Sequence, residues 1–143
     1  MDEIYRVCSD GGFVYSEVPF MQQVHEGAYD FTRYTLAGHR RLAERFDEIE
    51  SGAVAGPATA LVWSIEHFAL ALAGGGPRRR TVVQAIVRLC CAWLKELDRL
   101  VAHRPAALDG ASCTYFLGVR RRDAVSDADI VAAYRGAQPL SHL

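Results

Sequence analysis

The sequence predicts an all-α protein, on three observations. Apolar residues recur at helical spacing along most of the 143 residues, and strand-like alternation is rare. Glycine and proline separate the periodic segments, at Gly56-Pro57 and again over 74–77. The segment 57–73 is apolar on nearly every side, which indicates a helix surrounded by other helices. We therefore expect a single domain, residues 1–143, in which amphipathic helices wrap a central hydrophobic helical hairpin.

The first half of the chain predicts two amphipathic helices after a short mixed segment. Ser16 begins a helix-start pattern, and apolar positions then return every three or four residues from Phe20 to Phe31. A bend is expected near Gly38, where glycine weakens a helix. The second predicted helix spans 39–50. Its apolar face consists of Leu42, Phe46 and Ile49.

The second half predicts the two legs of the hairpin and two shorter helices. Pro57 suits the first turn of the hydrophobic helix, where its missing N–H costs nothing. The returning leg begins near Thr81, as a capping-box pattern indicates, and stops at Pro105. Its apolar stripe consists of Val83, Ile86, Cys90, Trp93, Leu97 and Leu100. Short helices are expected over 112–117 and 126–136.

Composition excludes several classes of protein. Sixteen basic and 17 acidic side chains give a net charge of −1, which disfavours nucleic acid as a partner. The hydrophobic helix carries Glu66 and His67 near its middle, so we expect no integral membrane span. The acidic start contains no apolar stretch, and the four cysteines lack the spacing of a disulfide framework. A cytoplasmic location is therefore expected.

The sequence shows no catalytic or metal-ligating constellation. The five histidines are scattered, and none has the spacing of a metal motif. Neighbours such as Glu66 and His67 point about 100° apart on a helix and do not share a site. The glycines at 74–76 follow a helix and lack the lysine of a phosphate-binding loop. We expect a protein without enzymatic activity, metal or cofactor.

The segment from Phe20 to Phe31 resembles the third homology motif of the B-cell-lymphoma-two (Bcl-2) family of apoptosis regulators. The family's motif has four apolar positions, a small residue before an aspartate, and a closing apolar residue. Ala28 stands at the small position and Phe31 at the last anchor. Tyr29 is a departure, because the family has aspartate there.

Two later segments resemble further motifs of the same family, in the same order. Gly52, Gly56 and Ala60 fall at the intervals of the first homology motif, although Pro57 replaces its arginine. Residues 82–117 resemble the segment that carries the second motif. The short chain without a tail anchor is most similar to a divergent viral member of the family.

The resemblance implies a Bcl-2-like helical bundle that inhibits apoptosis. Such a protein sequesters the amphipathic death-motif helix of pro-apoptotic family members in a hydrophobic surface groove, and those partners could recruit it to mitochondria from the host cytoplasm. The implied groove residues are Phe31, Tyr34, Phe46, Ile49, Ala55, Gly56, Pro57 and Ala60. Two alternatives stay open: a Bcl-2-fold viral inhibitor of inflammatory signalling, and a generic helical adaptor or homodimerisation module.

The proline at position 57 has a consequence within this resemblance. The family's arginine pairs with an aspartate of the incoming helix, and an unpaired buried aspartate loses about 2–5 kcal/mol. We therefore expect weaker binding or fewer partners, unless Arg33, Arg40 or Arg41 supplies the cation.

Overall fold

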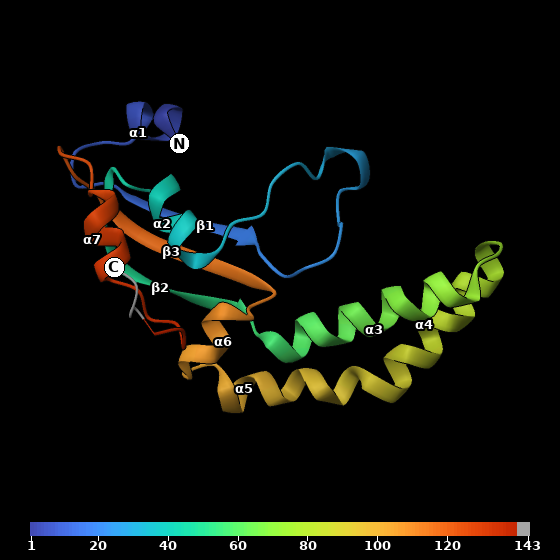
Figure 1. Ribbon diagram of the computed structural model, residues 1–143. Coiled ribbons are helices and arrows are strands. Elements are labelled where there is room, and N and C mark those ends of the chain that lie inside the picture. The colour runs from blue at the N-terminus through green and yellow to red at the C-terminus, as the bar shows by residue number, and fades with distance from the viewer. Residues whose placement is uncertain (140–143) are drawn as a thin grey trace.

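The protein consists of a three-stranded antiparallel sheet and a long helical arm (Figure 1), as a computed structural model describes for residues 1–139. The predicted all-α, Bcl-2-like bundle is therefore wrong: the fold is mixed α/β. The strands are β1 (Phe13–Pro19), β2 (Phe46–Ala55) and β3 (Cys113–Arg120). Their order in the sheet is β1-β3-β2, so the last strand in sequence lies in the middle.

The strand β3 occupies the segment 112–117 for which a helix was expected. Thr114, Phe116 and Gly118 are buried, and the residues between them are half-buried. A period of two is the pattern of a strand with one covered face. Both neighbours pair with β3 antiparallel, and Cys113 lies opposite Pro19 on one side and Ala55 on the other.

The helix predicted over 39–50 is wrong in its second half. Helix α2 (Leu36–Leu42) includes Gly38, and the chain then enters β2 at Phe46. Phe46 and Ile49 are three residues apart, which resembles helical spacing. They do not share a face, because Phe46 is 1% exposed and Ile49 is 52% exposed. A register shift between Glu48 and Glu50 interrupts the alternation of β2 and hides the strand from pattern analysis.

The helix predicted from Phe20 to Phe31 is replaced by a loop after β1. The only helical piece of this segment is the short η1 (Gly27–Tyr29). Gly27 has a φ of 55°, a left-handed conformation that a continuing right-handed helix excludes. The loop approaches the helical arm, where Gln23 Nε2 donates to Ser64 Oγ at 2.8 Å.

Short helices cover one face of the sheet and complete the core. The central cluster consists of Val14, Ala43, Phe46 and Phe116. Helix α1 (Asp2–Val7) supplies Tyr5, whose ring lies edge-on to Phe46 at 5.9 Å. Helix α7 (Asp127–Ala132) packs against α2. It begins as expected, because Ser126 Oγ accepts from the backbone N–H of Asp129 at 3.1 Å.

The opposite face of the sheet is largely exposed. Phe13 is 71% exposed, and the rings of Tyr15 and Tyr115 stack at 6.1 Å between centroids. The Tyr115 hydroxyl donates to Glu50 at 2.7 Å. This hydrogen bond to a carboxylate raises the pKa of Tyr115 to about 12.

His39 of α2 is fully buried beneath the sheet's covered face. Its Nε2 lies 2.7 Å from Ser16 Oγ and its Nδ1 lies 3.2 Å from Thr114 Oγ1. Burial lowers the pKa of His39, because the charged imidazolium would lose its hydration. In the unfolded chain the ring takes up a proton near pH 6.5. Below that pH the unfolded state therefore binds more protons than the folded state, and stability decreases as the pH falls.

We expect the free energy of unfolding to decrease as the pH is lowered from about 7.5 to about 5.5. Denaturant titrations at several pH values measure this slope. In His39→Gln the slope should be shallower, whereas His103→Gln, which removes an exposed histidine, should keep the wild-type slope. An unchanged slope in His39→Gln would contradict the assignment.

The helical arm connects β2 to β3. It runs out along α3 (Pro57–Ala73) and returns through α4 (Pro77–Cys91), η2 (Ala92–Leu97), α5 (Asp98–Val101) and α6 (Pro105–Asp109). The helix predicted over 57–73 is confirmed with the same bounds. Other helices do not wrap it, however: α3 packs on the returning leg, and the pair projects away from the sheet (Figure 1). Within residues 1–139, no helix combines the length and apolar character needed to cross a bilayer.

The turn between α3 and α4 requires glycine. Gly74 and Gly75 have φ values of 55° and 89°, and only glycine adopts this region without strain. Pro77 then begins α4 at its first turn. The predicted end of the first leg is confirmed, but the returning leg begins four residues before the expected start at Thr81, so the arginines at 78–80 are helical.

Candidate protein-docking surface

The two legs of the hairpin, residues 57–101, bury only a narrow strip between them. Helix α3 turns Val62 and Glu66 toward the returning leg, and Val87 is the buried residue of α4. The Glu66 carboxylate accepts from Gln84 Nε2 at 2.8 Å, and Arg88 Nε lies 3.5 Å away. One face of each helix is thus used, and the opposite faces stay open.

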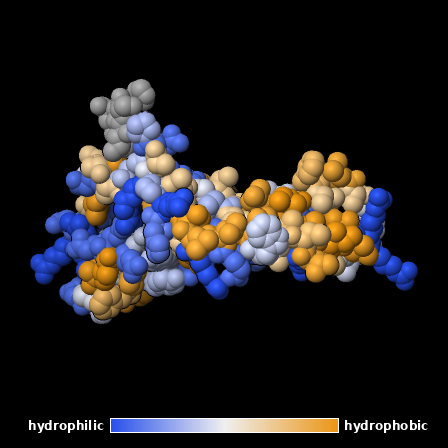
Figure 2. Space-filling view, turned by 90° about the horizontal axis from the view of Figure 1, so that it is seen from below, coloured by the Kyte–Doolittle hydropathy of each residue, from blue (hydrophilic) through white to orange (hydrophobic). Residues whose placement is uncertain are grey.

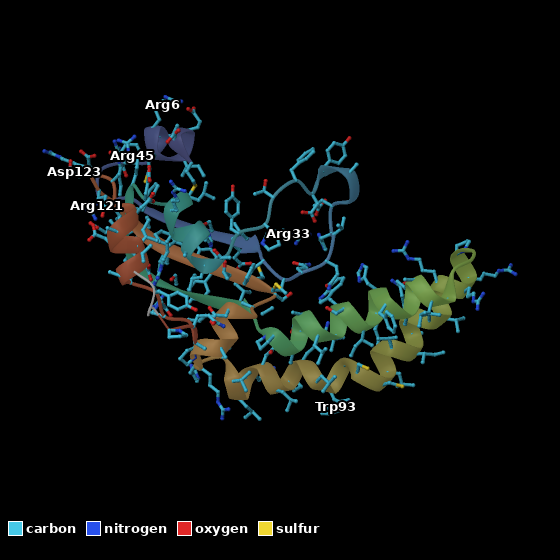
Figure 3. The ribbon with its side chains drawn as sticks, in the orientation of Figure 1. Arg6, Arg33, Arg45, Trp93, Arg121 and Asp123 are labelled. Atoms are coloured by element: carbon cyan, nitrogen blue, oxygen red, sulfur yellow. The ribbon has the colours of Figure 1, made fainter. Side chains whose placement is uncertain are left out.

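The open face of the returning leg is a continuous apolar stripe. We call it the α4 stripe; it consists of Val82, Ile86, Leu89, Trp93, Leu97 and Leu100. Val82, Ile86 and Leu89 follow one another at intervals of three or four residues on α4, the spacing with which one helix face pairs with another helix. The row continues beyond α4 with Trp93 and Leu97 on the 3-10 helix η2 and Leu100 on α5. Leu89 is 86% exposed and Leu100 is 72% exposed. Figure 3 places Trp93 on the outer edge of this leg.

The hairpin exposes many large apolar side chains. Five of the six members of the α4 stripe are more than half exposed. Leu61, Phe68 and Leu72 form a second exposed row on α3. Figure 2 shows hydrophobic residues gathered along the hairpin, with hydrophilic ones at its tip and over the sheet end. Surfaces of this kind mark sites of interaction.

The middle of the hairpin is cationic. Residues 67–95 contain no aspartate or glutamate. Their five cations are Arg78, Arg79, Arg80, Arg88 and Lys95. Of these, only Arg88 forms an ion pair among the described residues, the long one with Glu66.

A cavity of about 260 Å³ lies beside two of these cations. It opens between α3 and the returning leg, and its walls are Val62, Trp63, Glu66, Arg88, Ala92 and Lys95. The ammonium of Lys95 lies 5.8 Å from the centre of the Trp63 ring, within the range of a cation–π contact. The lining of the cavity therefore combines apolar side chains with the positive groups of Arg88 and Lys95 and the carboxylate of Glu66.

Asp98 fixes the base of the hairpin. Its carboxylate accepts hydrogen bonds from the backbone N–H groups of Gly56, Ala58 and Thr59, at 3.1, 2.8 and 2.9 Å. The Thr59 hydroxyl donates a fourth bond at 2.6 Å. Gly56, at the N-cap of α3, has no side chain with which to cap the helix. The carboxylate of Asp98 takes that role and ties the start of α3 to the start of α5.

The structure separates most of the residues predicted to line a groove. Phe31 and Tyr34 lie in the loop between β1 and α2, where Phe31 is 84% exposed. Phe46, Ile49 and Ala55 belong to β2. Phe46 is buried in the core, so its ring is not open to a partner.

The other three predicted groove residues lie together at the start of α3. Gly56 is the N-cap, and Pro57 and Ala60 stand in the first turn. A Cβ on Gly56 would lie 2.5 Å from Asp98 Oδ1. The close approach that this glycine permits is therefore made by the chain's own Asp98.

The three arginines considered as substitutes at Pro57 have other partners. Arg33 pairs with Asp30. Arg40 Nε lies 2.7 Å from Glu48, and Arg41 Nε lies 3.0 Å from Asp127. None of these carboxylates belongs to the hairpin.

Sequence analysis found part of the docking surface but assigned it to the core. Ile86, Trp93, Leu97 and Leu100 stand in the predicted apolar stripe of the returning leg. Leu89, the most exposed member of the α4 stripe, was not among them. Apolar spacing alone could not reveal the exposure of Leu89, because an apolar helix face has the same spacing whether it is buried or exposed.

No group of three or more His, Cys, Asp or Glu side chains in the part of the chain that the structure describes could hold a metal ion. The four cysteines are free thiols. Comparison with protein-family models, with curated proteins and with solved structures finds no match to this chain.

Proposed function

We propose that this protein is a protein-binding module whose α4 stripe receives an amphipathic helix of another protein. The observation that carries the proposal is the row of six exposed, large apolar side chains along the returning leg of a projecting hairpin. A partner helix with apolar residues at three- and four-residue intervals would match that face.

A helix from another protein suits this surface better than a second copy does. Two copies paired along the stripe would bring two cationic hairpins together, and like charges at an interface oppose association. The death-motif helix of pro-apoptotic proteins stays a prediction from the resemblance, as does interference with inflammatory signalling. Neither draws support from the groove residues, which the mixed α/β fold disperses.

The test uses a synthetic amphipathic helix with leucines at the matching intervals and glutamine at the flanking positions. Emission from Trp93 should shift to shorter wavelength on binding, because its indole leaves water. Leu89→Asp should weaken binding by about tenfold or more, as expected for a central anchor. Stability should change by less than about 0.5 kcal/mol, since the side chain is exposed.

Val7→Asp is the matched control, because Val7 is 66% exposed on α1, outside the hairpin. This variant should bind like the wild type. Light scattering measures the oligomeric state and so distinguishes a helix of another protein from a second copy of this chain as the occupant of the stripe. A wild-type dimer that Leu89→Asp converts to a monomer would make a second copy the occupant and would contradict the proposal.

A further inference from the structure

Strand β1 lies at one edge of the sheet, and the outer side of this strand is open. The N–H of Arg120 donates to the carbonyl of Gly12 at 2.9 Å, in line with the register of β1 on β3. Opposite residues of an antiparallel pair exchange hydrogen bonds at every second position, so the even-numbered residues of β1 face β3. The backbone N–H and C=O groups of Phe13, Tyr15 and Glu17 therefore point outward. In the part of the chain that the structure describes, no hydrogen bond from another segment reaches them.

The open stretch of this edge has a definite limit at each end. At one end the strand begins directly after the turn at Gly11, which has a φ of 72°. At the other end the Pro19 carbonyl accepts from the backbone N–H of Tyr34 at 3.1 Å, so the loop after β1 occupies the edge there. The free edge between these limits consists of residues 13–17, with Tyr15 at its centre.

The opposite edge of the sheet is protected, whereas the free edge of β1 is not. Strand β2 has register shifts after Glu48 and Ala53, and Arg135 Nη2 donates to the Ser51 carbonyl at 3.0 Å. Bulges, basic side chains and covering segments are common means by which an edge strand avoids pairing with another chain. Strand β1 pairs with β3 without a shift, and residues 13–17 include no lysine, arginine or proline.

We propose that a second copy of this chain pairs with β1 along the free edge, antiparallel and with the two Tyr15 residues opposite each other. In this register Phe13 of each copy lies opposite Glu17 of the other. Every outward-facing residue of the free edge then has a partner, and each opposite pair exchanges two hydrogen bonds. The two three-stranded sheets join into one continuous sheet, and the two-fold axis at Tyr15 closes the assembly as a dimer.

Hydrogen bonding and charge select this register over its neighbours. Outward-facing residues must lie opposite outward-facing residues, so the strands can slide only by two residues at a time. One such step places Phe13 opposite Pro19, which has no N–H and whose carbonyl is already bonded to Tyr34. A second step places the two Glu17 carboxylates opposite each other, which is destabilising. Sliding in the other direction leaves Glu17 without a partner inside the free edge.

The side chains of β1 also match those of a second copy. Opposite residues place their side chains on the same face, so the aromatic rings of both copies extend the open face of the sheet. Phe13 is 71% exposed and Tyr15 is 59% exposed, and the two Tyr15 rings would cover each other at the axis. The Glu17 carboxylate, which accepts from the Tyr15 hydroxyl at 2.5 Å, meets a ring instead of another carboxylate. An unrelated strand would have to supply this pattern, whereas β1 carries it in its own sequence.

Sedimentation of the full chain at concentrations from about 10 to about 500 µM should show a reversible equilibrium between monomer and dimer. Tyr15→Pro should weaken dimerisation by at least about tenfold, because proline removes the central N–H donor and places a ring at the edge. That N–H faces away from β3, so the sheet keeps its own hydrogen bonds. Circular dichroism should therefore show the wild-type content of strand.

An exchange of charge tests the register itself. Phe13→Glu should weaken the dimer by about fivefold or more, because it puts a carboxylate opposite Glu17 at both ends of the pairing. Adding Glu17→Lys should recover at least about threefold, since opposite charges then meet at both ends. Within one copy the two positions are about 13 Å apart along the strand, so the recovery cannot arise inside a monomer. Phe68→Glu is the matched control, at a ring 66% exposed on α3, and should leave the dimer intact.

The inference does not depend on the proposed function. A monomer at every concentration would overturn it, and so would a dimer that tolerates Tyr15→Pro. A double substitution that dimerises no better than Phe13→Glu alone would show that the register is wrong. Leu89→Asp, which weakens helix binding, should leave the β1 dimer in place. If Leu89→Asp dissociates the dimer and Tyr15→Pro does not, a second copy occupies the α4 stripe and both proposals fail.

Discussion

Replacing Phe46 with alanine is expected to lower the free energy of unfolding by about 3–5 kcal/mol. The ring is 1% exposed and lies in the cluster that joins β1, β3 and α2. Tyr5 packs edge-on against it and brings α1 into the core. Removal of the ring would leave a cavity, because strand pairing keeps β1 and β3 from moving together with α2 to fill it. Denaturant titration followed by circular dichroism measures the loss.

Phe31→Ala is the matched control, because it makes the same chemical change at a ring that is 84% exposed. Its effect should be within about 0.5 kcal/mol. The groove prediction treats the two phenylalanines alike, as partner contacts. Equal and small stability changes in the two variants would therefore show that Phe46 is not a core residue. Phe46→Leu gives a milder test if the alanine variant does not fold.

Asp98→Ala is expected to lower the free energy of unfolding by about 2–3 kcal/mol. One carboxylate satisfies three backbone N–H groups at the start of α3 and the hydroxyl of Thr59. Alanine would leave these donors without an acceptor, and a helix N-terminus without its anionic partner. The two legs of the hairpin would then separate at the base.

Tryptophan fluorescence reports this change selectively, because the chain's two tryptophans, Trp63 and Trp93, both lie in the hairpin. Asp98→Asn keeps one carbonyl acceptor and should lose less than alanine. Asp123→Ala, at an exposed position beside the sheet end (Figure 3), should be neutral. A hairpin that melts in Asp98→Ala at the wild-type denaturant concentration would show that the carboxylate does not hold it.

The helical arm could be predicted from sequence because its signals are local. Gly56-Pro57 opens α3, and the glycines before Pro77 close it. Each signal acts through the conformation of the residue that carries it. The bounds of α3 followed directly.

The sheet could not be predicted in the same way, because its stabilising partners are distant in sequence. Phe116 is buried by Val14 and Phe46, which lie far away along the chain. The register shift in β2 removed the alternation that would have revealed a strand. Once these strands were taken for helices, the motif resemblance placed Phe31, Phe46 and Ile49 in one groove.

The sequence predicts the apolar residues of the candidate site but not their exposure. The apolar stripe of the returning leg was found, but an apolar face indicates burial without saying against what. In the predicted bundle, other helices cover this apolar face. In the structure, no helix within residues 1–139 covers it. The exposures in the structure separate the two cases, since Leu89 is 86% exposed and Leu100 is 72% exposed.

The connection from β2 to β3 places the hairpin where an ordinary turn would suffice. Ala55 and Cys113 are paired at the ends of adjacent antiparallel strands, and Ser112 N donates to Ala55 O at 2.7 Å. Two strands that end in this way can be joined by two residues. The segment between them is thus far longer than the connection requires, and the entropic cost of a longer connection grows slowly with its length. A hairpin shortened or lengthened by whole helical turns should therefore leave the pairing of Ala55 with Cys113 in place.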